Sequence, residues 1–253
     1  MKTPSPFRRQ PGALPKIYGH RGVRGAAPEN TMAAFERALA EGADGIELDV
    51  RRCGSGELVV FHDADLGRLS GGADLRAVQR VPFHELERLD LGENQRIPRL
   101  SEVLSWARGR RVLVNVEVKG DAEPPLGLAR SVQRALAGVP QGERYLQVSS
   151  FHPQVLAALR ALGCPLLLGF LFHEGQQGWH PWLLGRALGV GALHPERTMS
   201  FPGAIERARA AEQIINVWTV NDEQEARDLS ALGVDGLITD EPGRIRRAVE
   251  GAP

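Results

Sequence analysis

Residues 45–63 read GIELDVRRCGSGELVVFHD, and this stretch decides the fold. Its first six residues have the length and apolar character of a buried strand, with Glu47 and Asp49 two positions apart. After a linker of six residues, Glu57–His62 forms a second β-rich run. Parallel neighbours need a connection of a dozen or more residues, so the second run is predicted to turn back antiparallel to the first. This hairpin returns His62 to the level at which the first strand ends.

Outside this hairpin, β-rich runs alternate with helical patterns along the whole chain. Strands are predicted at 17–20, 45–50, 112–119, 145–149, 166–171, 189–194, 214–219 and 236–239, and helices include 30–41, 100–108, 125–136, 153–162, 201–211 and 222–232. Such alternation indicates a parallel sheet with crossover helices. Eight strands indicate closure, so the predicted fold class is α/β, a (β/α)8 TIM barrel with a long insertion after strand two.

The length of 253 residues fits a single TIM-barrel catalytic domain, placed at residues 16–253 with the insertion at 51–98. Residues 1–15 contain four prolines and no periodic pattern, which predicts a flexible N-terminal arm. The loop from 63 to 98 is unusually long, and loops of that length in compact domains usually serve function.

Composition restricts the partners and the compartment. Acidic and basic residues number 31 each, which gives no reason to expect nucleic acid or an anionic membrane as partner. Cys53 and Cys164 have no metal-binding spacing and are predicted to be free thiols in a reducing compartment. The sequence has no run of about 18 apolar residues, so no membrane-spanning helix is predicted. The N-terminus has no apolar core typical of a signal peptide, so a cytoplasmic protein is expected.

Polar residues gather where predicted strands end. The first strand ends in His20-Arg21-Gly22, and the third carries Asn115, Glu117 and Lys119 at alternate positions. Residues i and i+2 of a strand share a face, so Glu47 with Asp49 and Glu117 with Lys119 are predicted to point to the barrel axis. The carboxyl ends of barrel strands carry the active site in this class of fold.

Three carboxylates that converge in a barrel mouth require a compensating charge, because burying each one ionised and unpaired costs several kcal/mol. Oxygen ligands without a nearby cysteine favour a hard divalent cation, Mg2+ or Ca2+. The alternative is an ion-pair network among Glu47, Asp49, Glu117 and Lys119 without a metal.

Two histidines, His20 and His62, are predicted at strand ends beside these carboxylates. Imidazole titrates near neutral pH, so the pair can supply a general acid and a general base. A single histidine is more often structural than catalytic, and the remaining five are interpreted mainly as loop or surface residues. Of these, His194 is the least clear because it also ends a predicted strand.

The order of motifs along the chain resembles the glycerophosphodiester phosphodiesterase family. The motifs are HRG (20–22), PENT (28–31), ELDV (47–50), HD (62–63), NVEVK (115–119), SSF (149–151), VWTVN (217–221) and GVDGLITDEP (233–242). Each motif alone is weak, but eight in this order over nearly the whole chain are specific. CGSG stands where the family often has an Asp-Gly turn, which concerns the hairpin and not the chemistry.

The resemblance implies roles for individual residues. Glu47, Asp49 and Glu117 would bind the divalent cation, His20 and His62 would be the acid–base pair, and Arg21 and Lys119 would hold phosphate oxygens. Glu29 would lie near the metal or orient His20, and Asn30 is interpreted as a helix cap. Trp218 and Phe151 would line the substrate pocket, with core packing as the alternative for both.

The resemblance also implies an activity: hydrolysis of glycerophosphodiesters to glycerol 3-phosphate and an alcohol. One alternative is lysophospholipase D-type action, since the aromatic segment 170–182 offers contacts for acyl chains, although packing on the barrel or a subunit contact also explains it. Another is a barrel that binds phosphodiesters without hydrolysing them. Whether the chain forms a homo-oligomer is left open by the sequence. The sequence also does not distinguish among leaving-group alcohols.

Overall fold

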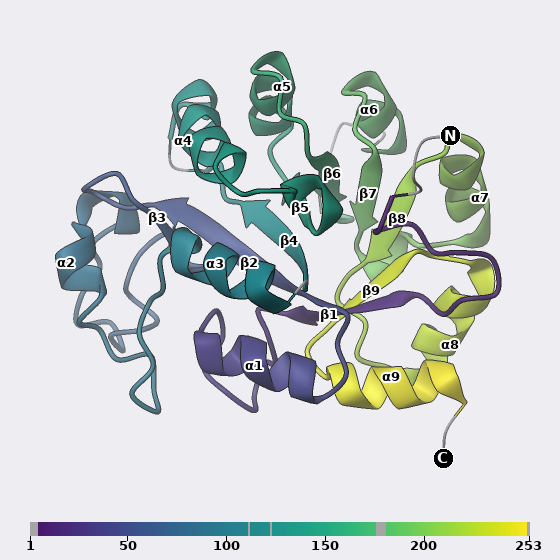
Figure 1. Ribbon diagram of the computed structural model, residues 1–253, viewed down its shortest axis with the longest axis horizontal. Helices are drawn as coiled ribbons and strands as arrows, with labels where there is room; N and C mark the ends of the chain where they lie inside the picture. Colours follow the sequence, from purple (N-terminus) through teal and green to yellow (C-terminus); the bar gives the residue numbers. More distant parts are fainter. Residues whose placement is uncertain (1–4, 111, 122, 176–180, 252–253) are drawn as a thin grey trace.

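The computed structural model describes residues 5–110, 112–121, 123–175 and 181–251 (Figure 1). Eight parallel strands form a closed barrel, because β1 pairs with β9 on one side and with β2 on the other. These strands are β1 (Lys16–His20), β2 (Gly45–Arg52), β4 (Leu113–Val118), β5 (Leu146–Ser150), β6 (Leu167–Phe172), β7 (Ala192–Pro195), β8 (Ile214–Val217) and β9 (Gly236–Thr239). The predicted TIM barrel is confirmed.

The predicted hairpin is also present. Strand β3 (Leu58–Val60) pairs antiparallel with the end of β2, with Val50 opposite Val60 and Arg51 opposite Val59. It is shorter than the run predicted at 57–62, and it extends β2 beyond the rim of the barrel. His62 therefore follows directly on a strand that is anchored to β2.

Helices surround the barrel (Figure 1). They are α1 (Met32–Ala40), α2 (Phe83–Leu86), α3 (Leu100–Arg110), α4 (Pro125–Ala137), α5 (Pro153–Ala161), α6 (Pro181–Ala187), α7 (Pro202–Ala210), α8 (Glu223–Leu232) and α9 (Pro242–Glu250). Each helix predicted from the sequence is present within two residues at either end. The last helix, α9, packs against β1 and α8 and was not predicted.

Side chains of the barrel strands alternate between two environments. Ile46, Leu48 and Val50 of β2 are fully buried in the layer between strands and helices, whereas Glu47 and Asp49 point to the barrel axis. Gly22 allows β1 and α1 to approach each other, since a Cβ atom at this position would lie 2.6 Å from the backbone of Ala34. This close approach explains the glycine of the HRG motif.

The insertion at 51–98 has a hydrophobic cluster of its own, on the side of the barrel where β3 and α2 lie (Figure 1). Its buried members are Cys53, Val59, Phe61, Leu66, Val78, Val81, Phe83, Leu86 and Ile97. The long connection is therefore a packed unit and not an open loop. Phe61, the neighbour of His62, is buried in this cluster, so the insertion helps to hold His62 in place.

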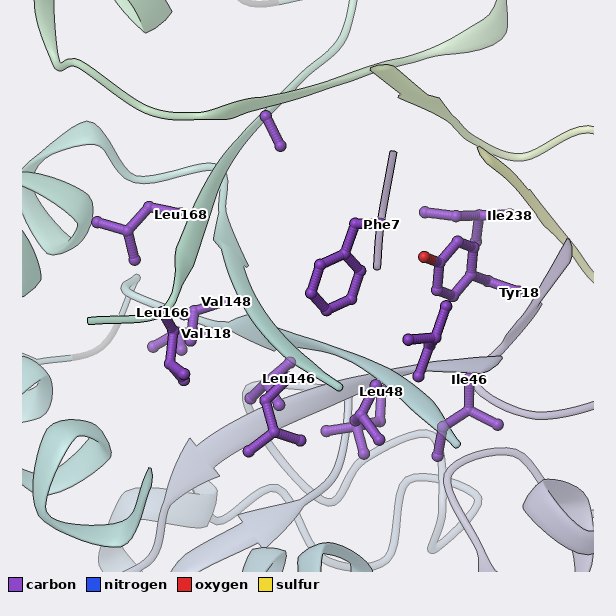
Figure 2. Close-up of a cluster of buried hydrophobic side chains, with 14 of the residues drawn as sticks. Phe7, Tyr18, Ile46, Leu48, Val118, Leu146, Val148, Leu166, Leu168 and Ile238 are labelled. Atoms are coloured by element: carbon purple, nitrogen blue, oxygen red, sulfur yellow. The ribbon is translucent and has the colours of Figure 1, made fainter. Parts of the chain in front are cut away.

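The N-terminal segment was predicted as a flexible arm, but its described part, residues 5–15, is packed against the barrel. Phe7 is 1% exposed and belongs to the same buried cluster as Tyr18, Leu48 and Leu146 (Figure 2). The backbone N–H of Arg9 donates to Asp235 over 2.8 Å. The proline-rich pattern of this segment gave no indication that Phe7 would be buried.

Two predictions from the sequence concern the cysteines and the lack of a membrane-spanning helix. Cys53 is buried and Cys164 partly buried, and both are free thiols as predicted. Among the described residues, no helix combines the length and apolar character that a membrane span needs.

Phe7 anchors the N-terminal segment, so its truncation should destabilise the protein. Replacing a buried phenylalanine by alanine costs about 3–5 kcal/mol. We expect Phe7→Ala to lower the free energy of unfolding by that amount in urea denaturation. Leu75→Ala is the control, because Leu75 is 73% exposed. Equal stabilities of the two variants would contradict the anchoring role.

Candidate active site

The carboxyl ends of the strands present two different halves around the barrel mouth. Strands β1, β2 and β4 and the insertion present charged groups and both histidines. In strands β5 to β8 the side chains of Ser149, Leu171, His194 and Asn216 face the lumen. Two positions further along each strand, at the level of the mouth, the same face carries Phe151, His173, Glu196 and Trp218. Charged groups and aromatic rings are thus separated across the mouth.

The predicted carboxylates converge. Glu47, Asp49 and Glu117 each offer an oxygen, and these atoms lie within 4.8 Å of one another. All three side chains are buried, and Glu47 Oε1 has no hydrogen-bond partner among the described residues. Adjacent positions in the sheet bring them together, since Asp49 of β2 lies opposite Glu117 of β4. This oxygen donor set fits a hard divalent cation.

The side chains of Lys119 and Arg21, together with the backbone N–H of Arg21, compensate part of this negative charge. Lys119 Nζ lies 2.9 Å from Asp49 Oδ1 and also contacts Glu117. Arg21 Nε lies 3.2 Å from Asp49 Oδ2, and its backbone N–H donates to Glu47 Oε2 over 3.0 Å. The ion-pair network proposed as the alternative to a metal therefore exists, and it leaves Glu47 Oε1 unused.

Asn30 was predicted to cap a helix, and this prediction is wrong. Its Nδ2 donates to Asp49 Oδ2 over 2.8 Å, and its Oδ1 accepts from the backbone N–H of Asp49 over 3.2 Å. Thr31 caps α1 instead, through a hydrogen bond from the backbone N–H of Ala34. Asn30 has a left-handed φ of 59°, which asparagine tolerates better than most residues. It orients a carboxylate of the cluster.

Burial and mutual repulsion separate the protonation behaviour of the three acids. Burial, assisted by the charge of Asp49, raises the pKa of Glu47 to about 8. Burial also raises the pKa of Glu117, although Lys119 opposes it. For Asp49 burial favours the neutral form, but Lys119 and Arg21 together outweigh it and lower the pKa. A cation bound among the three acids would favour the ionised form of each of them.

His20 is held by a carboxylate that the sequence prediction missed. Its Nδ1 lies 2.7 Å from Asp240 Oδ1, at the end of β9, and Asn221 Nδ2 donates to the other oxygen of Asp240 over 2.7 Å. Burial opposes protonation of His20, but Asp240 and Glu47 outweigh it and raise its pKa. The fixed Nδ1 leaves Nε2 for proton transfer.

His62 has a second carboxylate of its own. Its Nδ1 lies 2.8 Å from Asp63 Oδ1, and Arg68 Nε donates to Asp63 Oδ2 over 2.6 Å. Burial is the largest influence on His62, and it outweighs the opposing charge of Asp49 and lowers the pKa. The two histidines thus have the same arrangement at Nδ1 but opposite pKa shifts.

Glu29 connects the β1 loop with the insertion. Its carboxylate lies 3.1 Å from Arg21 Nη1 and 3.6 Å from Arg24 Nε, and it contacts Arg68 over 2.5 Å. Within the part of the chain that the structure describes, the ion pairs of Glu29 are with arginines and not with His20, so its predicted role near the metal or in orienting His20 stays a prediction. Its position between the three guanidinium groups holds Arg21 next to the acid cluster.

The aromatic half is ordered by ring contacts. Phe151 meets Trp218 edge to face, with ring centroids 5.3 Å apart, and meets His173 at 5.8 Å. Lys119 Nζ lies 5.9 Å from the centre of the Phe151 ring. Trp218 Nε1 donates to the backbone oxygen of His194 over 2.8 Å. Trp218 and Phe151 therefore stand side by side at the mouth, as partly exposed residues.

His194 lies below this level, inside the barrel. It is fully buried, its Nε2 lies 3.2 Å from Asn216 Nδ2, and burial lowers its pKa to about 3. It is a neutral residue of the lumen and not a surface residue. His84 is exposed and His152 and His173 are partly exposed, as interpreted, whereas His180 lies outside the described residues.

Comparison with known proteins agrees with this geometry. The family model for the glycerophosphoryl diester phosphodiesterase family matches residues 20–244. A glycerophosphodiester phosphodiesterase of Caldanaerobacter subterraneus subsp. tengcongensis is 32% identical over 233 residues, covering 89% of this chain and 94% of that protein. One from Bacillus altitudinis is 34% identical over 254 residues, covering 91% and 96%.

Solved structures are similar over almost the whole length. A phosphodiesterase of Oleispira antarctica, in complex with the product sn-glycerol-3-phosphate, superposes with a TM-score of 0.84 at 27% identity, covering 94% of this chain and 97% of that one. A glycerophosphodiester phosphodiesterase of Thermotoga maritima gives a TM-score of 0.76 at 28% identity, covering 92% and 97%. The barrel with its acidic mouth is thus that of a phosphoric diester hydrolase. The chain belongs to the glycerophosphoryl diester phosphodiesterase family.

The raised pKa of Glu47 predicts a pH dependence of stability in the absence of a cation. Its folded value of about 8 lies above the ordinary 4.5, so this group destabilises the fold increasingly as pH rises between these values. We expect the melting temperature of chelator-treated protein to fall over this range. The fall should be smaller in Glu47→Gln, while His20, whose pKa is also raised, leaves a residual slope.

Glu206→Gln is the matched control for this measurement, because Glu206 is exposed on α7. It should follow the wild-type curve at every pH. Identical slopes in Glu47→Gln and wild type would show that Glu47 is ionised without a cation, contrary to the arrangement described above.

Proposed function

We propose that the protein hydrolyses glycerophosphodiesters to glycerol 3-phosphate and an alcohol, with a divalent cation and two histidines. The observation that carries the proposal is the position of three converging carboxylates close to two imidazoles, each of which is itself held by a further carboxylate. The Oleispira relative, with sn-glycerol-3-phosphate as its product, supports the same product for this chain.

Glu47, Asp49 and Glu117 would hold the cation, either Mg2+ or Ca2+, which supplies positive charge against the non-bridging phosphate oxygens. Arg21 and Lys119 complement it, since both already lie against the acid cluster and both reach the mouth. Guanidinium and ammonium groups at this position stabilise the charge that develops on phosphorus oxygens in the transition state.

The chemistry proceeds in two steps. One histidine takes the proton of the glycerol hydroxyl next to the ester, and that oxygen attacks phosphorus. The bond from phosphorus to the leaving alcohol breaks, and the other histidine protonates the departing oxygen. Water then opens the cyclic phosphate while the two histidines exchange roles, which yields glycerol 3-phosphate.

The hydrogen bonds at Nδ1 prepare both rings for this exchange. Asp240 and Asp63 hold the Nδ1 atoms of His20 and His62, which leaves the Nε2 atom of each ring for proton transfer. The opposite pKa shifts let one ring be protonated while the other is neutral at a single pH. An acid–base pair needs that difference.

The alternatives have less support. A barrel that only binds phosphodiesters has no use for two oriented imidazoles beside a cation site. Lysophospholipase D-type action was suggested by the aromatic segment 170–182, of which residues 176–180 lie outside the described residues. The partly exposed aromatic residues that are described, Phe151 and Trp218, serve a small alcohol equally well.

Both histidines should be essential. We expect His20→Ala and His62→Ala each to lower kcat by about 10²–10⁴-fold, which is the usual contribution of general acid–base catalysis. Release of glycerol 3-phosphate from glycerophosphocholine measures it. His84→Ala, on the exposed side of α2, is the control and should retain the wild-type rate. Near-normal turnover by either site variant would remove that histidine from the mechanism.

Cation dependence should be visible both by chelation and through Asn30. Thorough chelation should abolish hydrolysis, and added Mg2+ or Ca2+ should restore it. Loss of a residue that orients a metal ligand costs about 10–100-fold in affinity, so Asn30→Ala should raise the cation concentration for half-maximal activity by that factor. Gln224→Ala, an exposed amide on α8, should titrate as wild type. Full activity after chelation would exclude a role for the cation.

A further inference from the structure

The aromatic half of the mouth contains a carboxylate that the proposed reaction does not use. Glu196 follows β7 and pairs through its backbone with Trp218, in a parallel bridge beyond the ends of β7 and β8. Residues paired in this way direct their side chains to the same side of a sheet. Since His194, two positions earlier, points into the lumen, Glu196 lies on the mouth side together with Trp218.

The backbone fixes this carboxylate in place. Glu196 Oε2 accepts a hydrogen bond from the backbone N–H of Glu174 over 3.3 Å, and the backbone N–H of Glu196 donates to Phe172 over 2.9 Å. Both partners lie at the end of β6 or just after it, so Glu196 is tied to the rim beside His173. The side chain is partly exposed.

Neighbouring cations already have other partners. Arg197, the next residue, lies 3.3 Å from Glu225 on the outside of the barrel. Lys119, below Phe151, is neutralised by Asp49 and Glu117. The wall made by Phe151, His173, Glu196 and Trp218, which we call the aromatic wall, therefore combines aromatic rings with the carboxylate of Glu196.

We propose that the aromatic wall binds an ammonium group on the leaving alcohol, so that choline and ethanolamine diesters are the preferred substrates. This inference rests on the proposed function and specifies its substrate class. Aromatic faces attract quaternary and primary ammonium groups through their quadrupole, and a carboxylate adds charge attraction. The phosphate would lie against the half that holds the divalent cation, Arg21 and Lys119, and the ammonium against the opposite half, which matches the charge distribution of a zwitterionic diester.

Other alcohols fit this wall less well. A second glycerol can hydrogen-bond to Glu196, but it gains nothing from the π-faces of Trp218 and Phe151. A phosphoinositol would place its negative charge against Glu196, and serine would bring a carboxylate there together with its ammonium group. The ratio of specificity constants between an ammonium diester and a neutral diester therefore measures the contribution of the wall.

The experiment compares kcat/KM for glycerophosphocholine, glycerophosphoethanolamine and glycerophosphoglycerol, with the full chain and saturating divalent cation. Wild type should favour the two ammonium diesters over glycerophosphoglycerol by about tenfold. Glu196→Gln and Trp218→Leu should each reduce that ratio by about fivefold, whereas Trp218→Phe should largely preserve it. Glu174→Gln is the matched control, because it removes an exposed carboxylate near the same rim, and its ratio should equal that of wild type.

A wild-type ratio near one, or an equal change of the ratio in Glu196→Gln and Glu174→Gln, would overturn the inference. Absence of turnover on all three diesters would instead contradict the proposed function. In that case calorimetric titration of choline still decides about the wall. Binding to wild type that is weakened in Glu196→Gln supports it, and equal or absent binding in both proteins overturns it.

Discussion

The site depends on the mutual repulsion of three carboxylates that the barrel forces into one buried space. Glu47, Asp49 and Glu117 cannot move apart, because their strands are adjacent and paired in register. Lys119 and Arg21 neutralise Asp49 but leave Glu47 with a raised pKa and an oxygen without a partner. A folded chain with this arrangement holds unfavourable electrostatic energy, which a divalent cation bound among the carboxylates would relieve. The same excess of negative charge favours binding of a cation, and in the proposed function the bound cation would in turn bind phosphate.

The insertion supplies what the eight strands cannot. A parallel barrel brings strand ends to one level, but a second imidazole opposite His20 has to come from outside the strand order. The antiparallel strand β3 brings the chain back to β2, and a separate hydrophobic cluster keeps it there. Arg68 then contacts Asp63 and Glu29, so the insertion and the β1 loop share one ion-pair network. In the proposed mechanism, catalysis would therefore depend on the packing of two hydrophobic clusters, and not of the barrel alone.

Sequence patterns gave the barrel, the hairpin and the acid cluster because each of these follows from local rules: the length of connections, and the alternation of side chains along a strand. Contacts between distant segments were missed for the opposite reason. Asp240 reaches His20 only because β9 closes the barrel beside β1. Asn30 reaches Asp49 because its own left-handed backbone conformation turns its side chain away from the helix. The signal for Asp240 was the motif GVDGLITDEP (233–242), which contains β9 and, directly after it, Asp240. Phe7 had no signal, since a single aromatic residue among prolines carries no periodicity.

The division of the mouth into two halves follows from the same alternation that places the metal ligands. Every lumen-facing position at the end of β5 to β8 could have carried another charged group without affecting the barrel below, where Gln147, His194 and Asn216 already fill the lumen. Instead Phe151 and Trp218 expose rings there, and Glu196 is the acidic member of that half. With a divalent cation held among the three carboxylates, the proposed site would have positive charge in one half and a carboxylate with aromatic rings in the other. A zwitterionic diester would be oriented by this charge difference before any bond changes, with its phosphate at the cation and its ammonium group at Glu196.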